Sequence, residues 1–179
     1  MVTSNAFDDQ ATAVLVPIKD FRQAKNRLSG RLDAPARETL ARTMAERVVK
    51  AAGNHSVHVV CNDHDVANWA QSVGAEVIWV RQDGLNPAIT EAATQIKDQF
   101  VHMTIAHADL PHAESLGGIA RANTVTIVPD RHRQAAPLTS LPSRGEVRGP
   151  RCGRDPTAAG CARTWPDRRF PGSSGSHAR

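Results

Sequence analysis

The sequence predicts an α/β domain in three layers, with a doubly wound and mostly parallel sheet. Over roughly the first 130 residues, short apolar runs alternate with segments of helical length and period. The runs are continuously apolar, which is typical of strands buried on both faces of a parallel sheet. The helical segments between them are long enough for right-handed crossovers. A chain of 179 residues can form one such domain with a real core.

The first strand and the first helix carry the clearest signals. Residues 13–18, "AVLVPI", form a continuous apolar run and are predicted as a strand. Asp33 is a candidate N-cap for the helix that follows, Pro35 falls in its first turn, and Gly53 marks its end. Apolar residues recur four positions apart at Leu40, Met44 and Val48.

The remaining elements alternate in the same way up to residue 129. Asn86 and Pro87 occupy the cap and first-turn positions of one of the helices. We predict strands at 56–61, 76–80, 101–106 and 124–129, and helices at 65–74, 86–100 and near 113–122.

The chain changes character near residue 135. Residues 135–179 are rich in Arg, Pro, Gly, Ala and Ser and show no helical or strand period, so we predict a folded domain at 1–134 and a tail without a packed core. The domain contains 14 Lys and Arg against 15 Asp and Glu, whereas the tail contains 8 against 3. The tail has only Trp165 and Phe170 as stacking residues, so specific nucleic-acid binding is not expected.

Export, membrane insertion and zinc binding are not expected. The chain shows no basic and apolar leader pattern near its start and no apolar run of membrane-spanning length, so we expect a cytoplasmic protein without a membrane partner. The three cysteines form no CxxC pair, and Cys61 is predicted to be a buried small hydrophobe. Three neighbouring histidines also lack a zinc spacing and are expected to be hydrogen-bonded or exposed. They are His102, His107 and His112.

Charged residues gather where the predicted strands end. Four cations follow the first strand within nine positions, and carboxylates follow three other strands. Cations this close repel one another, so they indicate a bound anion, or else an ordinary exposed face. Doubly wound sheets bind ligands at the carboxyl ends of their strands, and this combination suits a phosphate ester with a bridging divalent cation. The residues are Lys19, Arg22, Lys25 and Arg27, and Asp63, Asp109 and Asp130.

Five segments, in this order and spacing, resemble the guanylyltransferases of deazaflavin coenzyme F-420 biosynthesis. They are "LVPIKDFRQAKNRLSG", the helix after "LDAPAR", "DGLNPAI", "HADLP" and "VPDR". The resemblance covers residues 13 to about 134. It implies a nucleotidyltransferase fold of the nucleotide-diphospho-sugar transferase type. It also implies transfer of GMP from GTP to 2-phospholactate or phosphoenolpyruvate, with Mg²⁺ as cofactor.

The resemblance assigns roles to individual residues. Asp109 would be the ligand of the catalytic magnesium, and Asn86 would lie near the nucleotide, with a helix cap as the alternative. Asp130 and Arg131 would contact the substrates. The expected partners are therefore GTP and a small phosphorylated three-carbon acid, and a homo-oligomer is left open. The residues that would hold the GTP phosphates and neutralise the leaving pyrophosphate are Lys19, Lys25 and Arg27.

The resemblance breaks after "PDR". The family continues with a Gly-Thr-Asn segment, a Gly-Pro-x-Ser loop for the acceptor acid and an Asp-Thr-Pro-x-Asp-Leu stretch, none of which follows here. Synonymous codons can be chosen for residues 134–143 such that the same DNA, read from the third base, encodes Gly-Gly-Thr-Thr-Asn-Val-Leu-Ala-Val. A shifted reading of codons for residues 154–160 likewise encodes Gly-Pro-Asp-Ser-Ser-Arg. We hypothesise that a frame change near residue 134 replaced the C-terminal third. The domain would then be C-terminally incomplete, and this chain would have little or no transferase activity.

Two other functions stay open on the sequence. One is a nucleotidyltransferase of the same fold that acts on a molybdenum cofactor or a sugar phosphate, which acceptor tests would distinguish. The other is a non-catalytic nucleotide-binding protein, or one whose basic tail binds an acidic partner. A tail of that kind predicts steeply salt-dependent binding through residues 135–179. The sequence does not decide between the two acceptor acids.

Overall fold

A computed structural model describes residues 12–119, 125–128 and 138–142 of the chain. The chain divides into two units, residues 1–148 and 149–179, and every described residue belongs to the first. The described strands are β1 (Thr12–Pro17), β2 (Ser56–Cys61), β3 (Glu76–Trp79), β4 (His102–Ala106), β5 (Thr126–Val128) and β6 (Leu138–Pro142). The helices are α1 (Ala34–Ala51), α2 (His64–Ser72) and α3 (Leu85–Ile96), with a short 3₁₀ helix, η1 (Asn26–Leu28).

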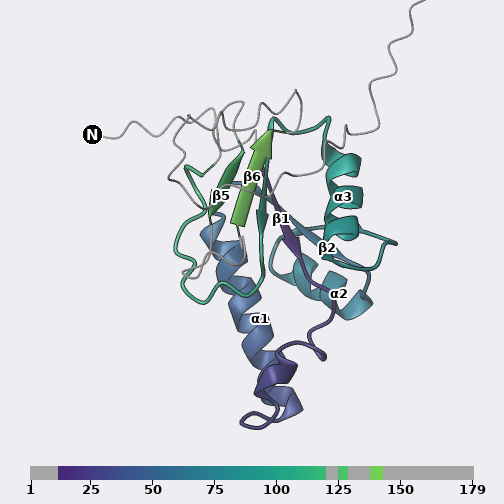
Figure 1. The fold of residues 1–179 in the computed structure, drawn as a ribbon, viewed down its shortest axis with the longest axis vertical. Coiled ribbons are helices and arrows are strands. Elements are labelled where there is room, and N and C mark those ends of the chain that lie inside the picture. The colour runs from purple at the N-terminus through teal and green to yellow at the C-terminus, as the bar shows by residue number, and fades with distance from the viewer. Residues whose placement is uncertain (1–11, 120–124, 129–137, 143–179) are drawn as a thin grey trace, which may run out of the picture. The chain divides into compact units, whose positions relative to one another are not determined.

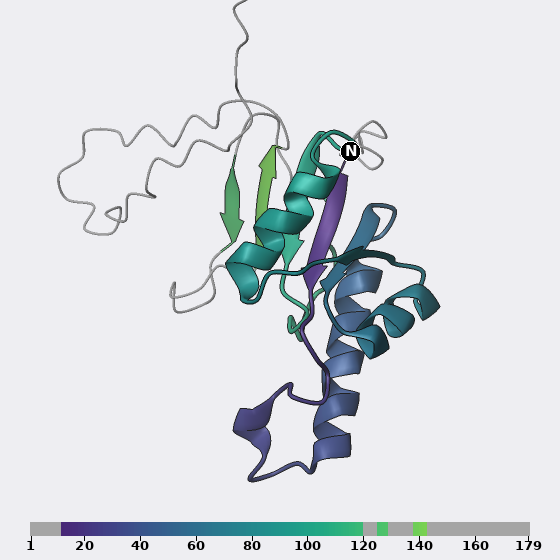
Figure 2. The same cartoon turned by 90° about the vertical axis from the view of Figure 1, so that its right-hand side faces the viewer.

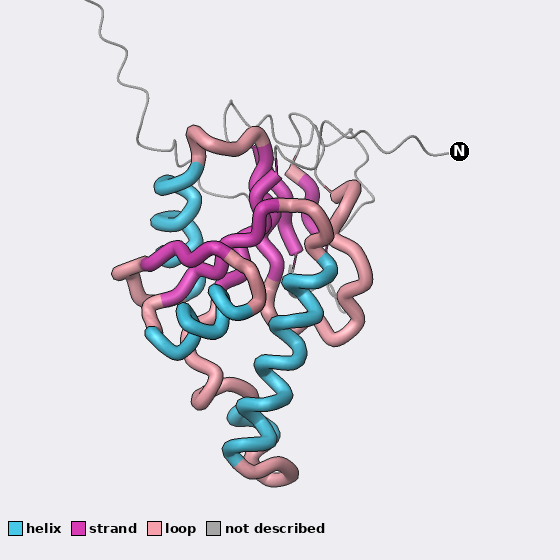
Figure 3. The backbone as a smooth tube through the Cα atoms, turned by 180° about the vertical axis from the view of Figure 1, so that it is seen from behind, coloured by secondary structure: helices cyan, strands magenta, loops and turns pink. Residues whose placement is uncertain are grey.

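The strands form one sheet in the order β3-β2-β1-β4-β6-β5 (Figure 1). The β1, β2, β3 and β4 pairs are parallel, whereas β6 is antiparallel to both β4 and β5. Helices connect the first four strands in alternation, as the colours of Figure 3 show along the tube. The predicted α/β class with a mostly parallel sheet is therefore confirmed.

Strand β1 lies in the centre of the sheet and is covered on both faces. Val14 and Val16 are fully buried in a core that includes residues of α1 and α2. Ala13 and Leu15, which point to the other face, are fully buried in a second core with residues of α3. Figure 2 shows α3 packed over the face of the sheet opposite to α1 and α2. Burial on both faces explains why the strand is continuously apolar, and it confirms the three layers.

Helix α1 has the ends that its sequence predicts. The Asp33 side chain accepts a hydrogen bond from the Ala36 N–H at 2.9 Å, so it is the N-cap. Gly53 follows the helix with φ of +62°, a left-handed conformation that favours glycine. Cys61 is also buried as expected, and burial raises the pKa of its thiol.

Two parts of the sequence prediction are wrong. Residues 113–119 of the predicted helix near 113–122 follow an irregular path, in which Gly118 has φ of +73°. A pair of glycines, Gly117 and Gly118, disfavours helix at this point because glycine has high conformational freedom. The predicted absence of regular structure after residue 135 fails at β6, which pairs with β4 and so covers an edge of the parallel sheet. The proposed division at residue 134 stays a prediction.

None of the helices in the described part of the chain is both long and apolar enough to span a membrane.

The buried His58 should make stability depend on pH. Burial lowers the pKa of this imidazole below 6.5, and Glu76, whose Oε2 lies 3.5 Å from Nδ1, opposes the shift only in part. The unfolded chain therefore binds a proton at a higher pH than the folded chain does, so the free energy of unfolding falls as the pH drops below about 6.5. We expect His58→Leu to flatten this fall between pH 7.5 and 5.5, measured by urea unfolding. A variant of the exposed His112 controls for the loss of one imidazole, and an unchanged pH slope in His58→Leu would contradict the prediction.

Candidate active site

The candidate site lies at the carboxyl ends of the four parallel strands. Because β1 to β4 run in the same direction, the loops that follow them meet at one edge of the sheet. These loops carry most of the charged residues that the sequence places after strand ends: Lys19, Arg22, Lys25, Arg27, Asp63 and Asp109. The segment between β1 and α1 extends beyond this edge (Figure 1).

Lys25 and Asp109 form the contact that joins the first and fourth loops. Lys25 Nζ lies 3.0 Å from Asp109 Oδ2, although the two residues are 84 positions apart in the chain. The side chain of Lys25 is 23% exposed and that of Asp109 is 56% exposed, so the pair faces solvent on the carboxylate side. Lys25 has φ of +57°, the one positive φ among the described non-glycine residues. Such strained backbone is concentrated at functional sites, because the surrounding structure has to hold it in place.

Arg22 is the centre of a second charged group. Its guanidinium lies 2.9 Å from Asp63 Oδ2, 3.1 Å from Asp20 Oδ1 and 3.8 Å from Asp65 Oδ2. Burial alone would raise the pKa of Asp20, but hydrogen bonds from the backbone N–H and the side chain of Arg22 outweigh it and lower that pKa. Asp63 also caps α2, since its Oδ1 accepts from the Asp65 and Val66 N–H groups. Arg22 therefore holds the β1 loop against the start of α2.

The remaining predicted cations are more open. Lys19 Nζ lies 3.5 Å from Asp83 Oδ1, and both side chains are largely exposed, so this pair contributes little to stability. Arg27 lies in η1, is exposed, and forms no ion pair with another described residue. Both cations are therefore available to an anionic ligand. Their exposure agrees equally with the other interpretation of the sequence, in which these cations form an ordinary solvated surface.

The helix-cap interpretation of Asn86 is wrong. Gly84 is the N-cap of α3, with φ of +92° and ψ of 151°, and Asn86 is the second residue of the helix. The exposed Asn86 side chain is therefore not needed as a cap. Asp130 and Arg131, which the sequence placed near the substrates, lie outside the described residues.

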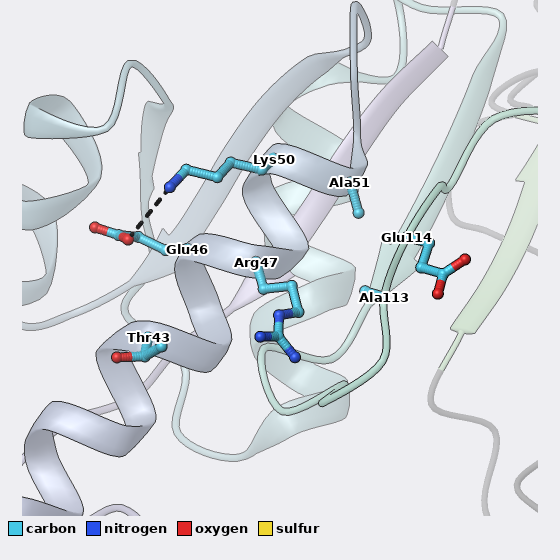
Figure 4. Close-up of a pocket in the computed structure, with 7 residues that line it drawn as sticks. All are labelled: Thr43, Glu46, Arg47, Lys50, Ala51, Ala113 and Glu114. Carbon is cyan, nitrogen blue, oxygen red and sulfur yellow. Dashed lines mark ion pairs between the residues drawn. The ribbon is translucent and has the colours of Figure 1, made fainter.

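The segment that carries Asp109 is held against α1. Arg47 of α1 donates a hydrogen bond to the carbonyl of Pro111, and the Leu116 N–H donates to the carbonyl of Ala51 at 2.8 Å. Figure 4 shows Arg47 directed toward this segment, next to a cavity of about 270 Å³. None of the predicted site residues lines this cavity. Its lining residues are Thr43, Glu46, Arg47, Lys50, Ala51, Ala113 and Glu114.

Asp109 fits a magnesium site of one particular kind. The described residues contain no group of three or more side chains that could hold a metal by themselves. Mg²⁺, however, is commonly bound through one or two carboxylates together with substrate phosphates. A half-exposed carboxylate among cations at the ligand edge of the sheet suits that arrangement. Asp109 can therefore serve as one protein ligand, provided that a nucleotide supplies others.

The fold is that of the nucleotide-diphospho-sugar transferases. A solved structure from Desulfovibrio desulfuricans G20, described as a nucleotide-diphospho-sugar transferase, aligns with a TM-score of 0.58 at 13% sequence identity. The alignment covers 75% of this chain and 64% of that chain. At this level of identity the likeness shows the fold alone.

The family is shown by the sequence comparisons. Residues 12–132 match the family model described as "Guanylyl transferase CofC like". A 2-phospho-L-lactate guanylyltransferase of Methanocaldococcus jannaschii is 29% identical over 66% of this chain and 54% of its own length. A phosphoenolpyruvate guanylyltransferase of Chloroflexus aggregans is 30% identical over 72% of this chain and 70% of its own length. This chain belongs to the CofC-like guanylyl transferase family, and it spans about half to 70% of the length of these relatives.

Three residues of the site were not assigned a role from the sequence. Arg22 was noticed among the cations, but its three carboxylate partners depend on how the loops fold. Asp83 and Arg47 were not among the candidate residues. Asp83 follows β3 in the chain as Asp63 follows β2, so the rule that placed carboxylates after strands would have found it. The role of Arg47 depends on a contact with a backbone carbonyl, for which the sequence contains no pattern.

Proposed function

We propose that this domain is the scaffold of a guanylyltransferase that transfers GMP from GTP to 2-phospholactate or phosphoenolpyruvate, with release of pyrophosphate. The observation that carries the proposal is the convergence of Lys25 and Asp109, 3.0 Å apart, at the ligand edge of a fold shared with nucleotidyltransferases. Family membership selects guanylyl transfer over the molybdenum-cofactor and sugar-phosphate alternatives. The names of the relatives supply the two acceptor acids.

The reaction requires charge stabilisation more than covalent chemistry from the protein. An oxygen of the acceptor phosphate forms a bond to the α-phosphorus of GTP. The bond from that phosphorus to the bridging oxygen breaks, and pyrophosphate leaves with the electron pair. Negative charge develops on the leaving group, so cations that hold its oxygens lower the barrier. Lys19, Lys25 and Arg27 follow β1 on one side of the edge and would do this work.

Asp109 would hold the magnesium ion at this edge, as one carboxylate ligand. When bound, Mg²⁺ polarises phosphoryl oxygens and neutralises charge on the phosphates. The Lys25 ammonium group is already in contact with the carboxylate, so it directs Asp109 toward the cation cluster. Asn86 and the exposed Leu85, at the start of α3, offer a polar and an apolar contact to the nucleoside.

We also propose that the present C-terminal sequence results from a frame change near residue 134. The support comes from the family model, whose match covers residues 12–132, and from the shifted codon reading of residues 134–143. The segments that would bind the acceptor and supply a further metal carboxylate are then missing from this chain. Resequencing the gene tests this directly: a continuous frame with no homologous alternative frame would contradict it.

Nucleotide and acceptor specificity test the proposed reaction. A protein with the shifted frame restored is incubated with Mg²⁺, one nucleoside triphosphate and one acceptor, and pyrophosphate release is measured. We expect release with GTP and 2-phospholactate or phosphoenolpyruvate, and little with ATP or CTP. Release with a sugar phosphate or a molybdenum cofactor, but with neither acid, would instead assign the domain to another nucleotidyltransferase class.

A further inference from the structure

Residues 81–84, the last part of the loop between β3 and α3, have no buried side chain to hold them. Residues 81–87 are all exposed, whereas Val80 just before them is buried. Asp83, in the middle of the loop, pairs with Lys19 at 3.5 Å, but an exposed pair of this kind does not hold a backbone in place. The conformation of the loop therefore depends on its hydrogen bonds.

Glu91 of α3 provides two of these hydrogen bonds with a single oxygen. The backbone N–H groups of Arg81 and Gln82 both donate to Glu91 Oε2, each at 3.0 Å. One turn further along the same helix, Gln95 donates from Nε2 to the carbonyl of Trp79 at 3.2 Å. Hydrogen bonds to a charged acceptor are about twice as strong as neutral ones. Glu91 is therefore the main tie between the loop and the helix that follows it.

The backbone of Gly84 shows that the loop adopts a specific shape. Its φ of +92° and ψ of 151° lie in a region that side chains with a Cβ rarely adopt. The Ala88 N–H donates to the Gly84 carbonyl at 3.1 Å, which starts α3 at this point. Leu85 comes next, and its apolar side chain is 45% exposed. The hydrogen bonds to Glu91 thus order a loop that places Asp83, Leu85 and Asn86 at the ligand edge.

We infer that Glu91 is a positioning residue for GTP, and that it acts by holding the 81–84 loop in a conformation ready to bind the nucleotide. The inference rests on the proposed function. Glu91 would act through the loop and not by touching the ligand, because its Oε2 accepts the two N–H groups of the loop. A loop that is ordered before binding does not lose its conformational entropy on binding, so the affinity for the ligand rises.

Because Glu91 is charged, the inference can be tested by whether its substitution weakens or strengthens GTP binding. GTP is an anion, so removing a nearby carboxylate would strengthen its binding through charge alone. Loss of the loop tie acts in the opposite direction. Glu91→Ala removes both the charge and the acceptor, whereas Glu91→Gln removes the charge and keeps a carbonyl oxygen that can accept the same two N–H groups.

The experiment titrates GTP with Mg²⁺ into the chain in its present form by calorimetry. We expect Glu91→Ala to raise the Kd about 10-fold, and Glu91→Gln to keep the wild-type Kd or lower it. Glu46→Ala is the matched control for charge, because Glu46 lies on α1 and pairs with Lys50. Amide hydrogen exchange at Arg81 and Gln82 follows the tie itself and should speed up in Glu91→Ala only.

Each outcome separates the inference from the proposed function. If the wild-type chain does not bind GTP, the proposed function fails and the inference fails with it. If the wild type binds and both Glu91 variants bind equally well or more tightly, the inference alone is overturned. If both variants bind more weakly by the same factor, the loss does not follow the acceptor oxygen that Gln keeps, so holding the loop is not the role of Glu91, and the inference is again overturned. Urea unfolding of each variant separates a change in loop order from a loss of global stability.

Discussion

Restoring the reading frame after residue 134 should turn a chain without measurable GMP transfer into an active guanylyltransferase. The present chain contains Asp109 and the cations that we propose hold the GTP phosphates, but acceptor binding and a further metal carboxylate are expected from the restored segment. Both proteins are compared for pyrophosphate release from GTP at matched concentrations, with each acceptor acid. Catalysis multiplies the contributions of these groups, so we expect at least a ~100-fold difference in rate.

Strand β6 gives a structural reason to expect a gain in stability as well. It lies between β4 and β5, and its last residue, Pro142, has no N–H to donate to a neighbouring strand. The shifted reading of this stretch, Asn-Val-Leu-Ala-Val, contains no proline and is mostly apolar. The restored protein should therefore unfold at a higher urea concentration. Full activity in the present chain would show that no essential chemistry lies after residue 134.

Asp109→Asn should have the second large effect, on the metal-dependent step. The substitution keeps the size of the side chain but removes the charge that attracts Mg²⁺ and pairs with Lys25. A metal contact worth about 3 kcal/mol corresponds to a rate change of about 100-fold. We expect pyrophosphate release by the restored protein to fall by about this factor, and excess Mg²⁺ to recover part of it.

The control for Asp109→Asn is Glu114→Gln. Glu114 lies in the same segment, is exposed, and lines the cavity beside α1 rather than the ligand edge. This variant should keep the wild-type rate and magnesium dependence. Equal losses in the two variants would mean that the segment is sensitive to any loss of charge, and that Asp109 has no special role at the metal.

The strands and helices that the sequence predicts well are those for which two independent features of the sequence agree. Residues 13–17 of β1 are continuously apolar, and the strand is buried on both faces, as that pattern predicts. Helix α1 has a capping Asp33 and a following Gly53, and both adopt the expected geometry. The predicted helix near 113–122 has no such cap or stop signal, and its described segment is held by Arg47 and the Ala51 carbonyl instead of by helical hydrogen bonds.

Strand β6 was missed because nothing in its own sequence indicates a strand. Its residues include a proline and two hydroxyl residues and show no clear alternation. The pairing with β4 arises from the sheet edge that β4 offers. Tertiary context of this kind overrides local propensity and is not encoded within the segment itself.

The location of the candidate site was predictable, but its pairings were not. Strand order and strand direction place Lys19, Lys25 and Asp109 at one edge, and that follows from the alternation of strands and helices. The partners that these side chains select depend on loop conformations, such as the positive φ of Lys25. For the same reason, the double role of Asp63, as cap of α2 and as partner of Arg22, appears only in three dimensions.

The central claim is that the cations after β1 hold the phosphates of GTP, and a single titration tests it most directly. GTP with Mg²⁺ is titrated into the present chain and into its Lys25→Ala variant. A charged hydrogen bond contributes about 1.5 to 3 kcal/mol, so we predict saturable binding by the wild type and a Kd at least ~10-fold higher in the variant. Binding that is absent in the wild type, or equal in the two proteins, would contradict the claim.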